Sequence, residues 1–82
     1  MITVLLFGPV ADAAGLRSFT LAAEPACNVA DVLAQVAERH PEARRLITVV
    51  ALDGERIAPA DFTTRQLPDG AELVFMAMFS GG

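Results

Sequence analysis

The sequence has little cysteine and no long apolar run, and each shortage excludes a class of structure. The single cysteine, Cys27, excludes an internal disulfide and any metal site built from several cysteines, and it fits a reducing compartment. No stretch approaches the roughly 18 to 20 apolar residues that a membrane-spanning helix needs. The opening MITVLLFGPV has no basic leader and no small-residue cleavage site, so we expect a mature, cytoplasmic protein with no membrane partner.

Basic residues are scarce, and lysine is missing altogether. Ten acidic residues against six basic ones give a net charge of −4, which disfavours a nucleic acid and suits a basic protein partner. Without lysine, copies of the chain could not acylate one another's side chains if their carboxyl ends were activated. Nucleotide bias explains the missing lysine equally well. The six basic residues are Arg17, Arg39, Arg44, Arg45, Arg56 and Arg65.

The usual catalytic constellations are also missing. The sequence shows no Ser-His-Asp set, no carboxylate pair and no phosphate-cradling loop, so we expect no self-contained active site, no bound cofactor and no metal. His40, beside Pro41 at the end of a predicted helix, is expected to be structural or exposed rather than a base. Cys27 fits a small buried residue better than a redox or acylation site. Met76 and Met78 fit core and interface better than a metal site.

The apolar runs predict five strands in one domain. Apolar residues make up 54% of the 82 residues, which is enough to leave apolar surface for a partner. Strands are predicted at residues 1–8, 16–22, 46–52, 55–58 and 71–79. The first is apolar on both faces apart from Thr3, so we expect it in the middle of a sheet, paired with the second. Tight turns are predicted at Asp53-Gly54 and at residues 67–70.

One clear helix is predicted between the second and third strands. The side chain of Asn28 can cap free backbone N–H groups, and Asp31 places negative charge at the positive end of the helix. Pro41 should end the helix near His40, with Arg39 complementing its negative end. One apolar stripe should face the sheet. Its members are Val29, Val32, Leu33, Val36 and Ala37.

The remaining segments carry weaker signals. ADAAG, which closes on Gly15, has no clear pattern, residues 41–45 form a polar link, and residues 59–66 fit a loop or a single helical turn. The order of elements predicts an α+β fold with a mixed sheet of four to five strands and one main helix across one face.

The last two residues, Gly81 and Gly82, contribute nothing to a core. Glycine is the most costly residue to order, so a terminal pair has no value for folding. A use for the chain end itself would explain the pair.

The order of elements, the LPDGAEL turn before the last strand and the final Gly-Gly together resemble the ubiquitin-like β-grasp sulfur carriers of the ThiS/MoaD family. The opening ITVLLFGPVADAAG is similar to the MoaD branch, whose members begin with a strand that runs into a short helical segment and a glycine. MoaD members often carry Pro-Pro where this chain has Ala77-Met78, which leaves the choice of partner open. The resemblance implies a β-grasp domain at residues 1–76 and a flexible tail at residues 77–82.

The resemblance also implies a chemistry for Gly82. An adenylating enzyme of the ubiquitin-activating type (MoeB/ThiF-like) would use ATP to convert the C-terminal carboxylate into an acyl adenylate, and sulfur would replace AMP to give a thiocarboxylate. The carrier would then act as a cosubstrate, the small subunit of molybdopterin synthase. It would insert its tail into the MoaE-like large subunit of a heterotetramer and donate sulfur for the molybdenum cofactor. Arg44 and Arg45 could contact the activating enzyme, although a solvated loop suits them better.

Several residues besides Gly82 are candidates for partner contact. Glycines without a Cβ can pass through a channel hardly wider than the backbone. Because ordering the tail costs more than burying one phenylalanine returns, the body of the domain must also bind the partner. The candidates are Phe7, Met76, Phe79, Ser80 and Gly81.

Three other functions are compatible with the sequence. The chain could carry sulfur for thiamin thiazole or another thio-cofactor. It could be a ubiquitin-like protein modifier, with Gly82 ending in an isopeptide bond on a target lysine. It could also be a β-grasp binding module whose glycines are inert.

Overall fold

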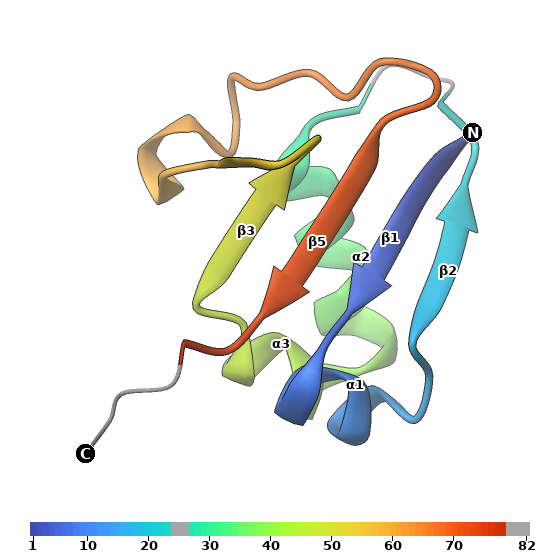
Figure 1. Ribbon diagram of the computed structural model, residues 1–82, viewed down its shortest axis with the longest axis vertical. Helices are drawn as coiled ribbons and strands as arrows, with labels where there is room; N and C mark the ends of the chain where they lie inside the picture. Colours follow the sequence, from blue (N-terminus) through green and yellow to red (C-terminus); the bar gives the residue numbers. More distant parts are fainter. Residues whose placement is uncertain (24–26, 79–82) are drawn as a thin grey trace.

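The computed structural model describes residues 1–23 and 27–78 and shows a five-stranded mixed sheet with helices on one face (Figure 1). The strand order is β2-β1-β5-β3-β4. This confirms the predicted α+β fold. The strands are β1 (Ile2–Leu6), β2 (Ser18–Leu21), β3 (Val49–Leu52), β4 (Glu55–Arg56) and β5 (Glu72–Met76), and the helices are α1 (Gly8–Ala14), α2 (Val29–Arg39), α3 (Pro41–Leu46) and the 3-10 turn η1 (Pro59–Asp61).

The first and last strands lie side by side in the centre of the sheet. β1 pairs with β2, as predicted, and the two strands are antiparallel. β1 also pairs parallel with β5, so that Val4 lies opposite Leu73. β5 pairs antiparallel with β3 on its other side, and β4 forms the short edge that the sequence predicts. Since β5 is the central strand, the chain leaves the sheet from its middle rather than from an edge.

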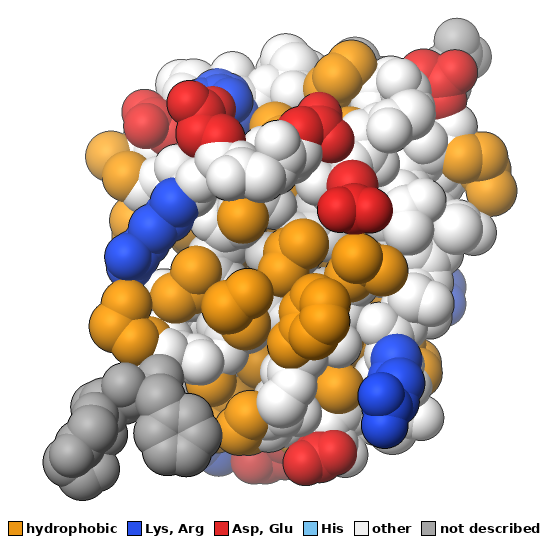
Figure 2. All heavy atoms as spheres, viewed as in Figure 1, with side chains coloured by type: hydrophobic (Ala, Val, Ile, Leu, Met, Phe, Trp, Pro, Cys, Tyr) orange, Lys and Arg blue, Asp and Glu red, His pale blue; other side chains and the backbone are white. Residues whose placement is uncertain are grey.

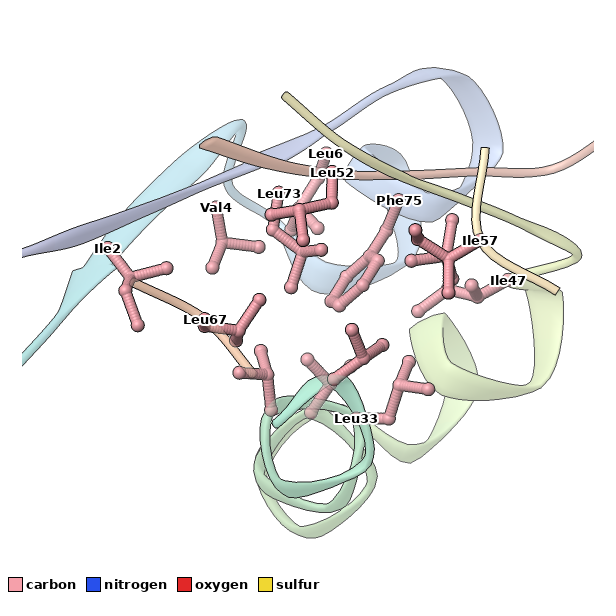
Figure 3. Close-up of a cluster of buried hydrophobic side chains, with 14 of the residues drawn as sticks. Ile2, Val4, Leu6, Leu33, Ile47, Leu52, Ile57, Leu67, Leu73 and Phe75 are labelled. Atoms are coloured by element: carbon pink, nitrogen blue, oxygen red, sulfur yellow. The ribbon is translucent and has the colours of Figure 1, made fainter. Parts of the chain in front are cut away.

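The core lies between the sheet and α2. Alternate residues of β1, β3 and β5 are buried, because successive side chains of a strand point to opposite faces. Figure 3 shows Val4, Leu73 and Phe75 pointing from the sheet toward the helical layer, where Leu33 lies. Four members of the predicted stripe are buried as expected: Val29, Val32, Leu33 and Val36.

Ala37 was wrongly assigned to that stripe, because its side chain is exposed. Each residue of a helix is rotated by about 100° from the one before it, so the position after Val36 lies beyond the edge of the buried face. The helix therefore contacts the core through a narrower stripe than the sequence predicts.

The predicted cap of α2 is present as a reciprocal pair of hydrogen bonds. The Oδ1 of Asn28 accepts a hydrogen bond from the backbone N–H of Asp31 at 2.9 Å, and the Oδ2 of Asp31 accepts one from the backbone N–H of Asn28 at 2.9 Å. The helix ends at Arg39, as expected from Pro41.

The polar link predicted at residues 41–45 is wrong, since the structure has helix α3 there. Proline is well suited to the first position of a helix, so Pro41 both ends α2 and begins α3. Ala43 is buried on the inner side of α3, and Arg44 and Arg45 lie in its last turn rather than in a loop. Leu46 belongs to α3 as well, so β3 begins three residues later than predicted.

Both predicted tight turns are present and contain residues with positive φ. The connections also contain a helix that residue patterns alone did not predict. Asp53 and Gly54 both have positive φ, at 49° and 87°, and link β3 to β4. The turn before β5 closes with a hydrogen bond from the N–H of Ala71 to the carbonyl of Pro68 at 3.0 Å. The segment after β1 forms α1, the short helix that the MoaD resemblance implies, and it ends at Gly15. Among the residues described, no helix has the length and apolar character needed to cross a membrane.

Candidate functional site

The C-terminal residues follow directly after β5, the central strand of the sheet. β5 ends at Met76, and Met76 and Met78 are each hydrogen-bonded to Thr48, the residue before β3. The N–H of Thr48 donates to the carbonyl of Met76 at 3.1 Å, and the N–H of Met78 donates to the Oγ1 of Thr48 at 2.5 Å. Four of the predicted site residues lie outside the described residues: Phe79, Ser80, Gly81 and Gly82. Their assignments stay predictions.

The sheet face that points away from the helices is apolar near the end of β5. The side chains of Leu5, Val49, Val74 and Met76 alternate with the buried core residues and are partly exposed. Figure 2 shows hydrophobic side chains gathered over the middle of this face. Helix α2 lies behind the sheet in the same view (Figure 1).

Phe7 extends this apolar face at the end of β1. It has extended backbone angles and is 49% exposed, and its N–H donates to the carbonyl of Phe75 at 3.2 Å. Leu6 lies opposite Phe75 in the parallel register, so one further step sets Phe7 beside Met76. The structure thus brings together the two residues of the domain body proposed as a docking surface. We call Leu5, Phe7, Val49, Val74 and Met76 the outer patch.

Three members of the outer patch, and Thr48, were missed in the sequence. Leu5, Val49 and Val74 lie in continuous apolar runs, where core and surface positions look alike. A signal was available, because these strands are apolar on both faces and only one main helix was predicted to cover them. Thr48 gave no such signal, because the group that its hydroxyl binds, the N–H of Met78, comes close to it only in the folded chain.

Charge is unevenly distributed along β5. Acidic side chains gather near the start of the strand, at the top of the view in Figure 2, and the outer patch lies near its end. Asp53 and Glu72 lie at this acidic end, where the Oδ1 of Asp53 accepts a hydrogen bond from the N–H of Glu72 at 2.8 Å. Nearby, Arg65 pairs with Glu55 at 2.5 Å. A partner seated on the outer patch would therefore meet mainly apolar side chains, with acidic ones toward the start of β5.

The described residues contain no cluster of three or more His, Cys, Asp or Glu side chains that could hold a metal ion. A groove of about 590 Å³ lies between the end of β1, α1 and the start of β2, and Phe7, Asp12 and Arg17 are among its lining residues. Burial raises the pKa of the Cys27 thiol and the nearby carboxylate of Asp31 raises it further, which disfavours the reactive thiolate. Neither the groove nor Cys27 forms a catalytic constellation.

The model of the ThiS family matches residues 4–82, which is nearly the whole chain and includes both terminal glycines. The chain belongs to the ThiS family. No curated protein matches it.

Solved structures similar to this ThiS family member cover almost the whole chain. SAMP1 from Haloferax volcanii is 25% identical with a TM-score of 0.76, covering 99% of this chain and 98% of that one. A Pyrococcus furiosus protein described as molybdopterin converting factor, subunit 1, is 16% identical with a TM-score of 0.76, covering 93% and 94%. The thiamine biosynthesis protein ThiS from Geobacter metallireducens is 20% identical with a TM-score of 0.61, covering 98% and 99%. The chain therefore has the β-grasp fold of sulfur carriers and ubiquitin-like modifiers.

Proposed function

We propose that this protein is a cytoplasmic sulfur carrier for molybdopterin biosynthesis, with Gly82 as the group that is charged. The observation that carries the proposal is the family match, which extends through Gly81 and Gly82 to the last residue of the sequence. The opening of the chain adds support for the MoaD branch, because β1 runs into the short helix α1 and then Gly15. The expected partners are a MoeB/ThiF-like adenylating enzyme and a MoaE-like large subunit in a heterotetramer.

The reaction is an acyl transfer in two steps. A carboxylate is a poor electrophile, so the activating enzyme first joins the Gly82 carboxylate to AMP from ATP and releases pyrophosphate. Hydrosulfide then attacks the acyl carbon and AMP leaves, which gives the thiocarboxylate directly. If a persulfide attacks instead, the product is an acyl disulfide, and a thiol must then reduce its S–S bond to release the thiocarboxylate. The resulting thiocarboxylate is a better nucleophile at sulfur than the carboxylate is at oxygen, so it can donate the sulfur to a pterin precursor.

Two glycines suit this chemistry because they remove all side-chain bulk from the reacting end. Without a Cβ at Gly81 or Gly82, the backbone can enter a narrow channel and the acyl carbon can be approached from either side. Residues 77–82 would reach roughly 20 Å if extended at about 3.3 Å each. That length suits a reaction in the interior of a partner.

The outer patch would hold the partner while the tail is inserted. Ordering the tail costs about 1 to 2 kcal/mol per residue, and burial of Phe79 would return only about 1.5 to 3 kcal/mol. Binding through the tail alone would therefore be weak. Phe7 and Met76 lie at the end of the sheet from which the tail departs, so one partner could cover both.

Similarities to solved structures also support two other functions for this chain. The similarity to SAMP1 structures, two of which are described as small archaeal modifier protein 1, favours conjugation of Gly82 to target lysines. The likeness to ThiS favours a thiazole or another thio-cofactor as the sulfur acceptor.

Intact mass spectrometry tests the proposal against these alternatives. The protein is incubated with a MoeB/ThiF-like enzyme, ATP and a sulfur source, with omission of ATP as the control. We expect a mass increase equal to the difference between sulfur and oxygen, and formation of molybdopterin when the MoaE-like subunit and pterin precursor are added. A ladder of conjugates would instead indicate a modifier, and an unchanged mass with every activating enzyme would contradict carrier function.

A further inference from the structure

The antiparallel ladder between β3 and β5 ends in an irregular way. Asp53 donates its N–H to the carbonyl of Glu72, and hydrogen-bonded pairs of such a ladder recur every two residues. In the same register the pair after Val49 and Met76 would join Ile47 and Met78. Instead, the N–H of Met78 donates to the side chain of Thr48.

The start of β3 explains why a side chain, rather than the backbone of Ile47, accepts the hydrogen bond from Met78. Ile47 is the C-terminal cap of α3, and its N–H donates to the carbonyl of Arg44 at 3.3 Å. The chain leaves a helix and enters a strand within three residues, so the backbone of Ile47 does not continue the ladder. Instead, the hydroxyl oxygen of the exposed Thr48 side chain accepts a hydrogen bond from the N–H of Met78. The N–H of Thr48 donates to the carbonyl of Met76.

We infer that Thr48 is a positioning residue for the C-terminal tail. Its two hydrogen bonds hold the backbone on both sides of Ala77, so that the chain stays attached next to the sheet as far as Met78. The part of the tail beyond the last of these hydrogen bonds is then residues 79–82 rather than residues 77–82. Its reach falls from roughly 20 Å to about 14 Å at most.

A fixed point closer to the chain end changes how the tail meets an activating enzyme. The fewer residues a chain end has beyond a fixed point, the less conformational entropy it can lose on docking, and this point lies close to Met76 in the outer patch. Thr48 should therefore lower the KM for the carrier. It should not change kcat, because the chemistry at Gly82 is the same once the tail is bound. This role rests on the proposed sulfur-carrier function.

Three variants of the full chain test the inference. Thr48→Val keeps the shape of the side chain and removes the hydroxyl, Thr48→Ser restores a hydroxyl, and Thr20→Val makes the same exchange on β2, away from the tail. Amide hydrogen exchange at Met78, followed by NMR, reports the hydrogen bond itself. Adenylation kinetics with a MoeB/ThiF-like enzyme report the consequence.

We expect Thr48→Val to speed exchange at Met78 and to raise the KM for the carrier, each by about threefold to tenfold, the effect of one typical hydrogen bond. kcat should be unchanged, and Thr48→Ser and Thr20→Val should behave like the wild type. Unchanged exchange at Met78 in Thr48→Val would overturn the inferred contact. Faster exchange with an unchanged KM would overturn the positioning role. If no activating enzyme charges the wild type, the proposed function fails and this role fails with it, whereas the Met78 exchange still decides the contact.

Discussion

At the residue scale, Asn28 joins helix α2 to the segment that follows η1. Its Oδ1 caps the helix through Asp31, and its Nδ2 donates a hydrogen bond to the carbonyl of Thr63 at 3.0 Å. Asn28 also forms a backbone bridge with Gln66. One side chain therefore stabilises both the start of the main helix and the approach to β5.

Replacing Asn28 by alanine should destabilise the domain by about 1 to 2 kcal/mol, because a cap and a second hydrogen bond are both lost. The unfolding midpoint, measured by circular dichroism, should fall by roughly 4 to 16 °C. Asn28→Ser keeps a capping oxygen and loses the donation to Thr63, so it should fall in between. Equal losses for serine and alanine would show that the cap contributes little.

Cys27 should react slowly in the folded protein. Partial burial and the carboxylate of Asp31 raise the pKa of its thiol, so less thiolate is present near pH 8 than in the unfolded chain. A raised folded pKa also means that stability is highest below the unfolded pKa and falls as the pH rises through the folded one. Alkylation by iodoacetamide, with and without denaturant, measures the difference. An equal rate in both states would contradict it.

At the element scale, the outer patch can be separated from the core by substitution. Phe7→Arg and Met76→Arg introduce charge on the partly exposed face, so affinity for a MoaE-like partner should fall at least tenfold, while the domain stays folded. Phe75→Ala is the control, since Phe75 is fully buried and its truncation should cost about 3 to 5 kcal/mol. Calorimetric titration gives the affinities and thermal unfolding gives the stabilities. Arginine variants that unfold, or bind as well as the wild type, would refute the docking surface.

An element could be predicted from the sequence where its start, its buried face and its end each have a residue signal. Short elements lack these signals and could not be predicted. Helix α2 combines a cap, a full apolar stripe and a proline stop, so its bounds follow from residues alone. Helix α3 has six residues, of which only Ala43 is buried, and this is too short to show a period. The apolar run from Leu46 to Leu52 then reads as one strand, although its first residue belongs to α3.

At the scale of the whole molecule, tertiary pairing assembles the candidate site. Phe7 and Met76 could be proposed from their places near strand ends, but their proximity depends on the parallel pairing of β1 with β5. Element order alone does not fix that pairing. The contact between Thr48 and Met78 likewise joins residues 30 positions apart and could not be read from either segment.

At the very end of the chain, Gly82 itself is proposed as the group that is charged. The most direct measurement is the thiocarboxylate yield, by intact mass, of the native chain and of a chain with one alanine appended after Gly82. We expect the native chain to be charged and the extended chain to stay uncharged, with nearly equal unfolding midpoints, because a tail residue contributes little to stability. An equal yield from the extended chain would contradict the account.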